Sequence, residues 1–293
     1  MTAEAAAERM VASAPDVEFV DVPFDGRSVR IEHRWLSRER YDAPLIVFLH
    51  EGLGSLAMWK DYPRQLCDAG GYRGLVFSRP GYGRSTPRPP GERWNVDFMH
   101  GQAQRLLPQL FDRLGVADER DAPWLFGHSD GASIGLIHAA TFPSSVAGVI
   151  AVAPHIVVED VSIRSIEDAR DAYRSGNVRT RLARYHDDAD SAFFGWNDIW
   201  LDPRFRAWSI EALLPSIACP VLAIQGTDDE YGTLAQVAGI RERVPHSEVV
   251  VLDDCRHSPH RDQPHALTRA AIDFMTRHGS RRRSTGGVHE ASS

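Results

Sequence analysis

One serine stands in a setting typical of an enzymatic nucleophile. Ser129 lies between His128 and Asp130 in the stretch GHSDG, with Gly127 and Gly131 two residues away on either side. A serine hydroxyl is a weak nucleophile at neutral pH, and it becomes reactive when a histidine that is itself oriented by a carboxylate accepts its proton. The sequence must therefore supply a base and an acid that the fold brings to Ser129.

Two later loops carry candidates for these partners. Asp228 and Asp229 lie in GTDDEYG, which follows the apolar run PVLAIQG, and His257 and His260 lie in DCRHSPH, which follows EVVVLDD. Loops that leave the carboxyl ends of parallel strands converge at one edge of the sheet. We therefore expect an acid and a base from these two loops to meet Ser129.

Short apolar runs rich in β-branched residues predict the strands that position these loops. Each is typical of a strand buried on both faces: PLIVFLH, GLVFS, WLFGHS, VAGVIAVAP, PVLAIQG and EVVVLDD. Helical segments alternate with them: MWKDYPRQLCDAG, NVDFMHGQAQRLLPQLFDRLG, the residues after Ser129, TLAQVAGIRERV and QPHALTRAAIDFMTRHG. VEFVDVPF and SVRIEHRWL predict an antiparallel hairpin around Asp25 and Gly26. The expected fold class is α/β, with a mostly parallel, doubly wound sheet.

The segment 156–216 interrupts this alternation. It has no strand-like run but many charges and aromatic side chains, namely Tyr185, Phe193, Phe194, Trp196, Trp200 and Trp208. A structureless loop of this length is improbable in a compact domain, so we expect an inserted helical cap between core segments 1–155 and 217–279. Trp196 and Trp200 are candidate substrate-pocket residues, and packing of cap against core is the alternative role.

Composition indicates a soluble globular protein without a nucleic-acid partner. Of the 293 residues 43% are apolar and 25% charged, and the net charge is −7. An acidic balance weighs against a nucleic-acid surface, and no apolar run approaches the roughly 18 residues of a membrane span. The segment 280–293, rich in Arg, Gly, Ser and Thr, predicts a disordered tail.

Cysteine and histidine spacing gives no sign of a cofactor. The three cysteines, widely separated, match neither a disulfide framework nor a CxxC metal site. No metal-ligand or dinucleotide-binding spacing is present, so we expect neither a metal nor another cofactor. The first residues lack the apolar core of a signal peptide, which predicts a cytoplasmic location.

The stretch around Ser129 resembles the GxSxG nucleophile elbow of the α/β-hydrolase family, whose catalytic residues follow the chain order Ser, Asp, His. The resemblance covers roughly residues 17–279. It implies Asp229 as the acid, three residues after the strand-ending Gly226, with Asp228 as the competitor. It implies His257 as the base, although Arg256 precedes it where the family often has glycine, and it leaves His260 as the alternative.

The stretch LHEGLGSLAMW resembles the family's HGxG oxyanion loop. The resemblance implies that backbone N–H groups stabilise the developing oxyanion, one from Asp130 and a second from this loop. Glu51 occupies the place of the usual first glycine, so Gly52 or Leu53 carries the second donor, and Gly52 is preferred. Glu51 is a candidate pocket carboxylate, with a surface charge as the alternative, and His50 is expected to be structural.

The expected function is that of a serine hydrolase acting on a small molecule. A Ser129, His257 and Asp229 triad would cleave an ester-, thioester- or lactone-type carbonyl through an acyl-enzyme. The alternative is a carbon–carbon bond hydrolase for ring-cleavage products of aromatic degradation. Against it, His128 stands where those enzymes usually have asparagine, and Ser258 where they usually have tryptophan. A non-catalytic ligand receptor of the same fold is the third hypothesis, and the oligomeric state, a homo-oligomer included, stays open.

Overall fold

Eight strands form one sheet. The computed structural model describes residues 17–116 and 122–285, without the side chains of 280–285. The order of the strands across the sheet is β1-β2-β4-β3-β5-β6-β7-β8. Their bounds are β1 Glu18–Phe24, β2 Arg27–Leu36, β3 Leu45–Leu49, β4 Arg73–Phe77, β5 Trp124–His128, β6 Gly148–Val152, β7 Val221–Gly226 and β8 Glu248–Leu252.

The sheet is mostly parallel, as the sequence predicts. Strands β1 and β2 form the expected antiparallel hairpin, and β2 pairs antiparallel with β4. Every other pairing is parallel, so β3 to β8 run in the same direction. The carboxyl ends of these six strands therefore meet at one edge, and the loops that follow them lie close together.

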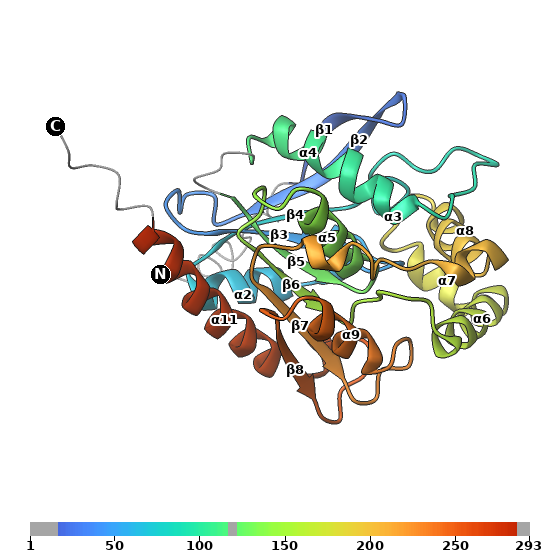
Figure 1. Cartoon of the computed structure of the whole chain (residues 1–293). Coiled ribbons are helices and arrows are strands. Elements are labelled where there is room, and N and C mark those ends of the chain that lie inside the picture. The colour runs from blue at the N-terminus through green and yellow to red at the C-terminus, as the bar shows by residue number, and fades with distance from the viewer. Residues whose placement is uncertain (1–16, 117–121, 286–293) are drawn as a thin grey trace, which may run out of the picture.

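Helices cover both faces of the sheet, as Figure 1 shows. One face carries α2 (Tyr62–Gly70) and α11 (Pro264–Thr285). The other carries α3 (Phe98–Gly101), the π-helical turn η3 (Gln102–Leu106), α4 (Leu107–Leu114), α5 (Asp130–Thr141) and α9 (Ala235–Arg243). Successive strand side chains point to opposite faces, so Val47 and Leu49 join one core while Ile46 and Phe48 join the other.

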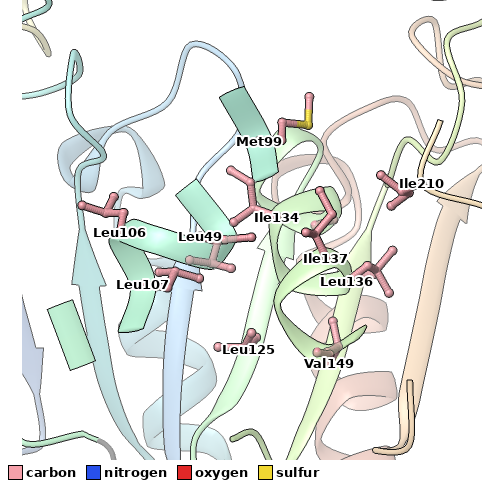
Figure 2. Packing of buried hydrophobic residues seen from close by; sticks show 14 of the residues in the cluster. Leu49, Met99, Leu106, Leu107, Leu125, Ile134, Leu136, Ile137, Val149 and Ile210 are labelled. Carbon is pink, nitrogen blue, oxygen red and sulfur yellow. The ribbon is translucent and has the colours of Figure 1, made fainter. Parts of the chain in front are cut away.

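Helix α5 lies in the middle of one core (Figure 2). Its residues from Asp130 to Ala140 are all buried, which is typical of a helix enclosed on every side. Ile134 and Ile137 share their cluster with Leu49 of β3 and with Leu106. Each fully buried aliphatic side chain contributes about 1.5–3 kcal/mol, so the helix that follows Ser129 is held firmly.

The segment between β6 and β7 is helical. It contains α6 (Asp160–Arg174), α7 (Asn177–Leu182), α8 (Ala189–Trp200) and the 3₁₀ turns η5 (Pro203–Ala207) and η6 (Leu214–Ser216). Helices α6, α7 and α8 gather at one end of the sheet, away from α11 (Figure 1). His186 fixes this segment, because its Nδ1 accepts from the Gly83 N–H at 2.9 Å and its Nε2–H donates to the Leu53 carbonyl at 3.0 Å.

Helix α11 corrects the expected start of the C-terminal tail. The helix continues to Thr285, so the first six residues of the predicted disordered segment 280–293 are helical. Three consecutive arginines, which are good helix formers, extend the helix where charge alone predicted disorder. Residues 286–293 lie outside the described part of the chain.

Candidate active site

Ser129 joins β5 to α5 in a strained conformation. Its φ of 54° and ψ of −120° lie in a region that non-glycine residues rarely occupy, at a cost of about 1–3 kcal/mol. Backbone hydrogen bonds hold it there: its N–H donates to the Val152 carbonyl at 2.9 Å, and its carbonyl accepts from the N–H of Ala132 at 2.8 Å. This is the elbow geometry that the GxSxG stretch predicts.

Two glycines allow the backbone to close around this turn. A Cβ at residue 131 would lie 2.0 Å from the carbonyl oxygen of Leu49, and one at residue 127 would lie 2.4 Å from the carbonyl oxygen of Gly131. Both obstacles are backbone atoms, which no side-chain rearrangement can move. Gly127 and Gly131 are therefore required by the close approach of β3, β5 and α5.

A hydrogen-bonded chain connects Ser129 to an acid through His257. The His257 Nε2 lies 3.0 Å from Ser129 Oγ, and its Nδ1 lies 2.8 and 2.9 Å from the two carboxylate oxygens of Asp229. A carboxylate only accepts hydrogen bonds, so Nδ1 carries the proton and Nε2 accepts from the Ser129 hydroxyl. These are the distances and the tautomer that a general base requires.

The carboxylate of Asp229 is fully buried and well supplied with donors. Oδ1 accepts from the N–H groups of Tyr231 at 2.8 Å and Gly232 at 3.2 Å, and Oδ2 accepts from the Gln225 amide at 2.6 Å. Burial acts to raise the pKa of Asp229, but the hydrogen bond with His257 and the backbone donors outweigh it and lower the pKa. Asp229 is therefore ionised and orients His257.

The two competing residues lie elsewhere. Asp228 is exposed, and in the described residues its carboxylate accepts a hydrogen bond only from the Thr227 hydroxyl, at 3.4 Å. His260 is buried against Trp59 and His128 and makes no hydrogen bond to Ser129. The structure thus brings Asp229 and His257 to Ser129, and it leaves Asp228 and His260 outside this chain of hydrogen bonds.

The expected oxyanion donors lie beside Ser129. Asp130 and Gly52 line the same pocket as Ser129, and no hydrogen bond within the described residues engages the backbone N–H of either. Asp130 is the first residue of α5, where the helix presents unpaired N–H groups and a partial positive charge. Leu53 has the same properties as Gly52, so either can supply the second donor.

Glu51 and His128 form a second acid–imidazole pair next to the first. His128 Nε2 lies 2.6 Å from the backbone carbonyl of His257 and must donate to it, so its Nδ1 faces Glu51 Oε2 at 3.6 Å. Burial acts to raise the pKa of Glu51, but His128 and the other nearby imidazoles lower it far more. Glu51 is therefore a carboxylate in the pocket, and His128 links it to the loop of the base.

The side chain of Asp130 is buried behind the elbow. It accepts a hydrogen bond from the Trp200 indole N–H at 3.2 Å and lies 3.9 Å from Nη2 of the buried Arg79. Burial raises the pKa of Asp130 to about 6, although Arg79 and Trp200 oppose the shift. The sequence pattern did not reveal Arg79, because an arginine in a glycine-rich turn is usually a surface residue.

A pocket of about 160 Å³ opens at Ser129. Its apolar walls are Leu53, Ile166, Trp196, Trp200 and Tyr231, and its polar residues include Glu51, His128, Asp130 and His155. All three expected pocket residues, Glu51, Trp196 and Trp200, line it. A larger hollow of about 230 Å³ beside the hairpin includes none of the residues around Ser129, so we assign the smaller pocket to the chemistry.

His155 is a pocket residue that the sequence reasoning missed. It is 2% exposed, and its Nδ1 has no hydrogen-bond partner in the described structure. Burial and the nearby His257 lower the pKa of His155 to about 3, so the ring is neutral. The sequence could have indicated His155, because it follows β6 closely and therefore lies at the same edge of the sheet as the other site residues.

Among the described residues, the other reactive groups form no second centre. The thiols of Cys67 and Cys255 are buried, and burial raises their pKa values to about 12 and about 11. In residues 17–116 and 122–285 no group of three or more metal-ligating side chains is arranged around a common point. Among the described helices, none combines the length and the apolar character needed to cross a bilayer.

The fold and these residues define a class of enzyme. A parallel sheet, a strained serine between strand and helix, and an acid and a histidine in two later loops are the features of a hydrolase with a nucleophile elbow. A family model described as the alpha/beta hydrolase family matches residues 46–270. The chain belongs to the alpha/beta hydrolase family and is a hydrolase, as expected from the sequence.

Solved structures share this fold at low sequence identity. A membrane phospholipase A described as a bacterial virulence factor is 20% identical, with a TM-score of 0.70 over 94% of this chain and 90% of that one. The enol-lactonase from Burkholderia xenovorans LB400 is 22% identical, with a TM-score of 0.68 over 88% of this chain and 100% of that one. The thermophilic esterase from Thermogutta terrifontis is 18% identical, with a TM-score of 0.67 over 89% and 99%. The comparison with curated proteins gave no match.

Proposed function

We propose that the protein is a serine hydrolase that cleaves a small ester, thioester or lactone through an acyl-enzyme. One observation carries this proposal: Ser129 Oγ, His257 and Asp229 form a continuous hydrogen-bonded chain with donor–acceptor distances of 3.0 and 2.8 Å at a pocket. The names of an esterase and an enol-lactonase among proteins of the same fold agree with this reaction class.

The geometry supports an ordered reaction. His257 Nε2 takes the hydroxyl proton as Ser129 Oγ attacks the substrate carbonyl, and the new oxyanion accepts hydrogen bonds from the N–H groups of Asp130 and Gly52. His257 then gives its proton to the leaving oxygen or sulfur, and the acyl group stays on Ser129. Water attacks this acyl-enzyme with His257 again as base, the bond from the acyl carbon to Ser129 Oγ breaks to release the acid, and His257 returns the proton to Oγ. Each oxyanion donor is worth about 3 kcal/mol in the transition state.

The segment 156–216 is proposed to act as the cap over this pocket. Ile166, Trp196 and Trp200 come from it and line the pocket together with core residues. Trp196 lies directly on the oxyanion loop, because a Cβ at Gly52 would meet its Nε1 at 2.2 Å. The cap would therefore shape the substrate site and exclude water from the reacting carbonyl.

The proposal is tested by covalent labelling combined with kinetics. A fluorophosphonate probe should label Ser129 in the folded wild type, and the variants Ser129→Ala and His257→Ala should lower kcat for a p-nitrophenyl ester by a factor on the order of 10⁴ to 10⁶. Ser175→Ala, at an exposed helix end, is the matched control and should be fully active.

Two results would contradict this function. Absence of an adduct on Ser129 in folded protein would favour a ligand receptor. Labelling of Ser129 together with turnover of a dienone ring-fission product, but of no ester, would favour carbon–carbon bond hydrolysis.

A further inference from the structure

The pocket at Ser129 has a marked excess of acceptor groups over positive charges. Glu51, Asp130 and His155 line it beside the proposed triad, and none of its lining residues is a lysine or an arginine. Arg79 is close by but does not line the pocket: its Nη2 donates to the Glu51 carbonyl at 2.8 Å and lies 3.9 Å from Asp130 Oδ2, and its Nε and Nη1 are buried without a partner in the described residues. A substrate carboxylate in this pocket would find no lysine or arginine among the lining residues.

Glu51 has accepting capacity that the fold does not use. Its side chain is 19% exposed, and its nearest charged neighbour is His128, at 3.6 Å. Apart from this contact with His128, no hydrogen bond in the part of the chain that the structure describes engages either carboxylate oxygen. An ionised carboxylate with free lone pairs in a partly desolvated pocket is a strong acceptor for a hydroxyl or ammonium group.

A second polar group in the pocket is also without a partner. His155 is almost fully buried, lines the pocket, and leaves its Nδ1 without a hydrogen bond in the described structure. Buried polar atoms without partners are uncommon and usually have a reason. A substrate group that hydrogen-bonds to Glu51 and to this neutral imidazole would supply those partners.

The volume of the pocket limits the size of this group. It measures about 160 Å³, and a cavity of about 150 Å³ holds one benzene ring. Trp196, Trp200 and Tyr231 give it flat aromatic walls. The space therefore suits one ring-sized group between indole and phenol faces.

We propose that the pocket selects substrates whose ring-sized acyl group carries a hydrogen-bond donor, a hydroxyl or an ammonium, which Glu51 accepts, and that it discriminates against acyl groups carrying a carboxylate. This inference rests on the proposed ester hydrolysis and adds the substrate class to it. Glu51 is then the specificity-determining residue of the oxyanion loop, in the position where the family usually has glycine.

The test uses four p-nitrophenyl benzoates: the unsubstituted ester and those with hydroxymethyl, aminomethyl or carboxylate at the meta position. For the wild type, kcat/KM for the hydroxymethyl and aminomethyl esters should exceed that for the carboxylate ester by on the order of tenfold or more. In Glu51→Gln the ratio of aminomethyl to carboxylate ester should fall by about tenfold. Glu39→Gln, an exposed residue in the turn that follows β2, makes the same charge change and should keep the wild-type ratio.

The ratio separates specificity from general damage. A variant that is merely misfolded loses activity toward all four esters equally, so its ratio does not change. Equal turnover of the substituted esters by the wild type, a preference for the carboxylate, or an unchanged ratio in Glu51→Gln would overturn the inference.

Binding gives an independent measurement. Calorimetric titration of Ser129→Ala with the methyl esters of the same three substituted acids should show the weakest binding for the carboxylate. Equal binding would overturn the specificity even if no ester were hydrolysed, whereas selective binding without turnover by the wild type would contradict the proposed function alone.

Discussion

At the scale of single residues, His128 and His257 both lie near Ser129, but only His257 presents an acceptor nitrogen to its hydroxyl. His128 is its neighbour in sequence, yet its Nε2–H is committed to the carbonyl of His257 at 2.6 Å. His257 is 128 residues away and places an unprotonated Nε2 at 3.0 Å from the hydroxyl. The difference arises from the hydrogen bond on the other ring nitrogen, which fixes the tautomer.

The acid can be distinguished by exchanging one carboxylate at a time. Asp229→Asn should lower kcat by on the order of 10⁴, because the amide favours the wrong tautomer of His257. Asp228→Asn should change kcat by less than about twofold, since this exposed carboxylate does not reach the imidazole. Steady-state kinetics of both variants on one ester provide the measurement, and the reverse result would make Asp228 the acid.

At the scale of elements, parallel strands bring distant loops to the same place. Ser129 follows β5, Asp229 follows β7 and His257 follows β8, and all three strands end at one edge of the sheet. The first turn of α5 lies against the end of β3, which carries the oxyanion loop. The spacing between α5 and β3 therefore sets the distance between Ser129, the proposed nucleophile, and the proposed oxyanion donors.

A methyl group at this contact tests that spacing. In Gly131→Ala the new Cβ would meet the Leu49 carbonyl, so we expect the free energy of unfolding to fall by about 1–3 kcal/mol. Because α5 moves away from β3, kcat/KM should also fall, and this loss, expressed as a free energy, should be the larger of the two. Urea unfolding and kinetics measure the two effects.

Gly135→Ala is the matched control for this substitution. It lies in the same helix, and the nearest atom to its new Cβ is an ordinary 3.5 Å away. Alanine favours a helix over glycine by about 1 kcal/mol, so this variant should be as stable as the wild type or more stable. Equal effects of the two substitutions would mean that the contact with β3 does not set the spacing.

At the scale of the whole molecule, the fold encloses many neutral imidazoles. Burial lowers the pKa of six buried histidines: His33, His50, His138, His155, His186 and His260. In the unfolded chain these groups titrate near pH 6.5. Below that pH the unfolded chain binds protons that the folded chain does not, so stability falls as the pH falls.

Acid should therefore unfold this protein steeply. Each such histidine lowers the unfolding free energy as the pH falls below about 6.5, by at most about 1.4 kcal/mol per pH unit, until the pH reaches the pKa of that group in the folded state. Asp130 acts in the opposite sense, since its pKa of about 6 means that its protonation favours the folded state, but it is a single group. Urea unfolding at pH 7.5, 6.5 and 5.5 should show a falling free energy, and an equal or higher value at pH 5.5 would contradict this account.

Much of the fold could be predicted from local patterns. Each apolar run became a strand and the hairpin formed as expected, because side-chain periodicity is a property of consecutive residues. The expected burial on both faces was wrong for β8, which lies at the edge of the sheet, where only Leu252 is buried and Val251 is 43% exposed. The positions of Ser129, Asp229 and His257 in their loops followed from the strand pattern and the family resemblance. The extension of α11 did not, because composition alone does not distinguish a charged helix end from a disordered tail.

The sequence by itself determined which elements form and which loops carry reactive side chains, since these depend on neighbours along the chain. Only the tertiary structure decided the roles of His128, His155 and Arg79. It also distinguished Asp229 from Asp228, because the carboxylate of Asp229 lies within hydrogen-bond distance of His257 Nδ1. Those roles depend on contacts between segments that lie tens to more than a hundred residues apart, and on burial, which changes the charge that each group carries. Neither quantity can be read from the order of the residues alone.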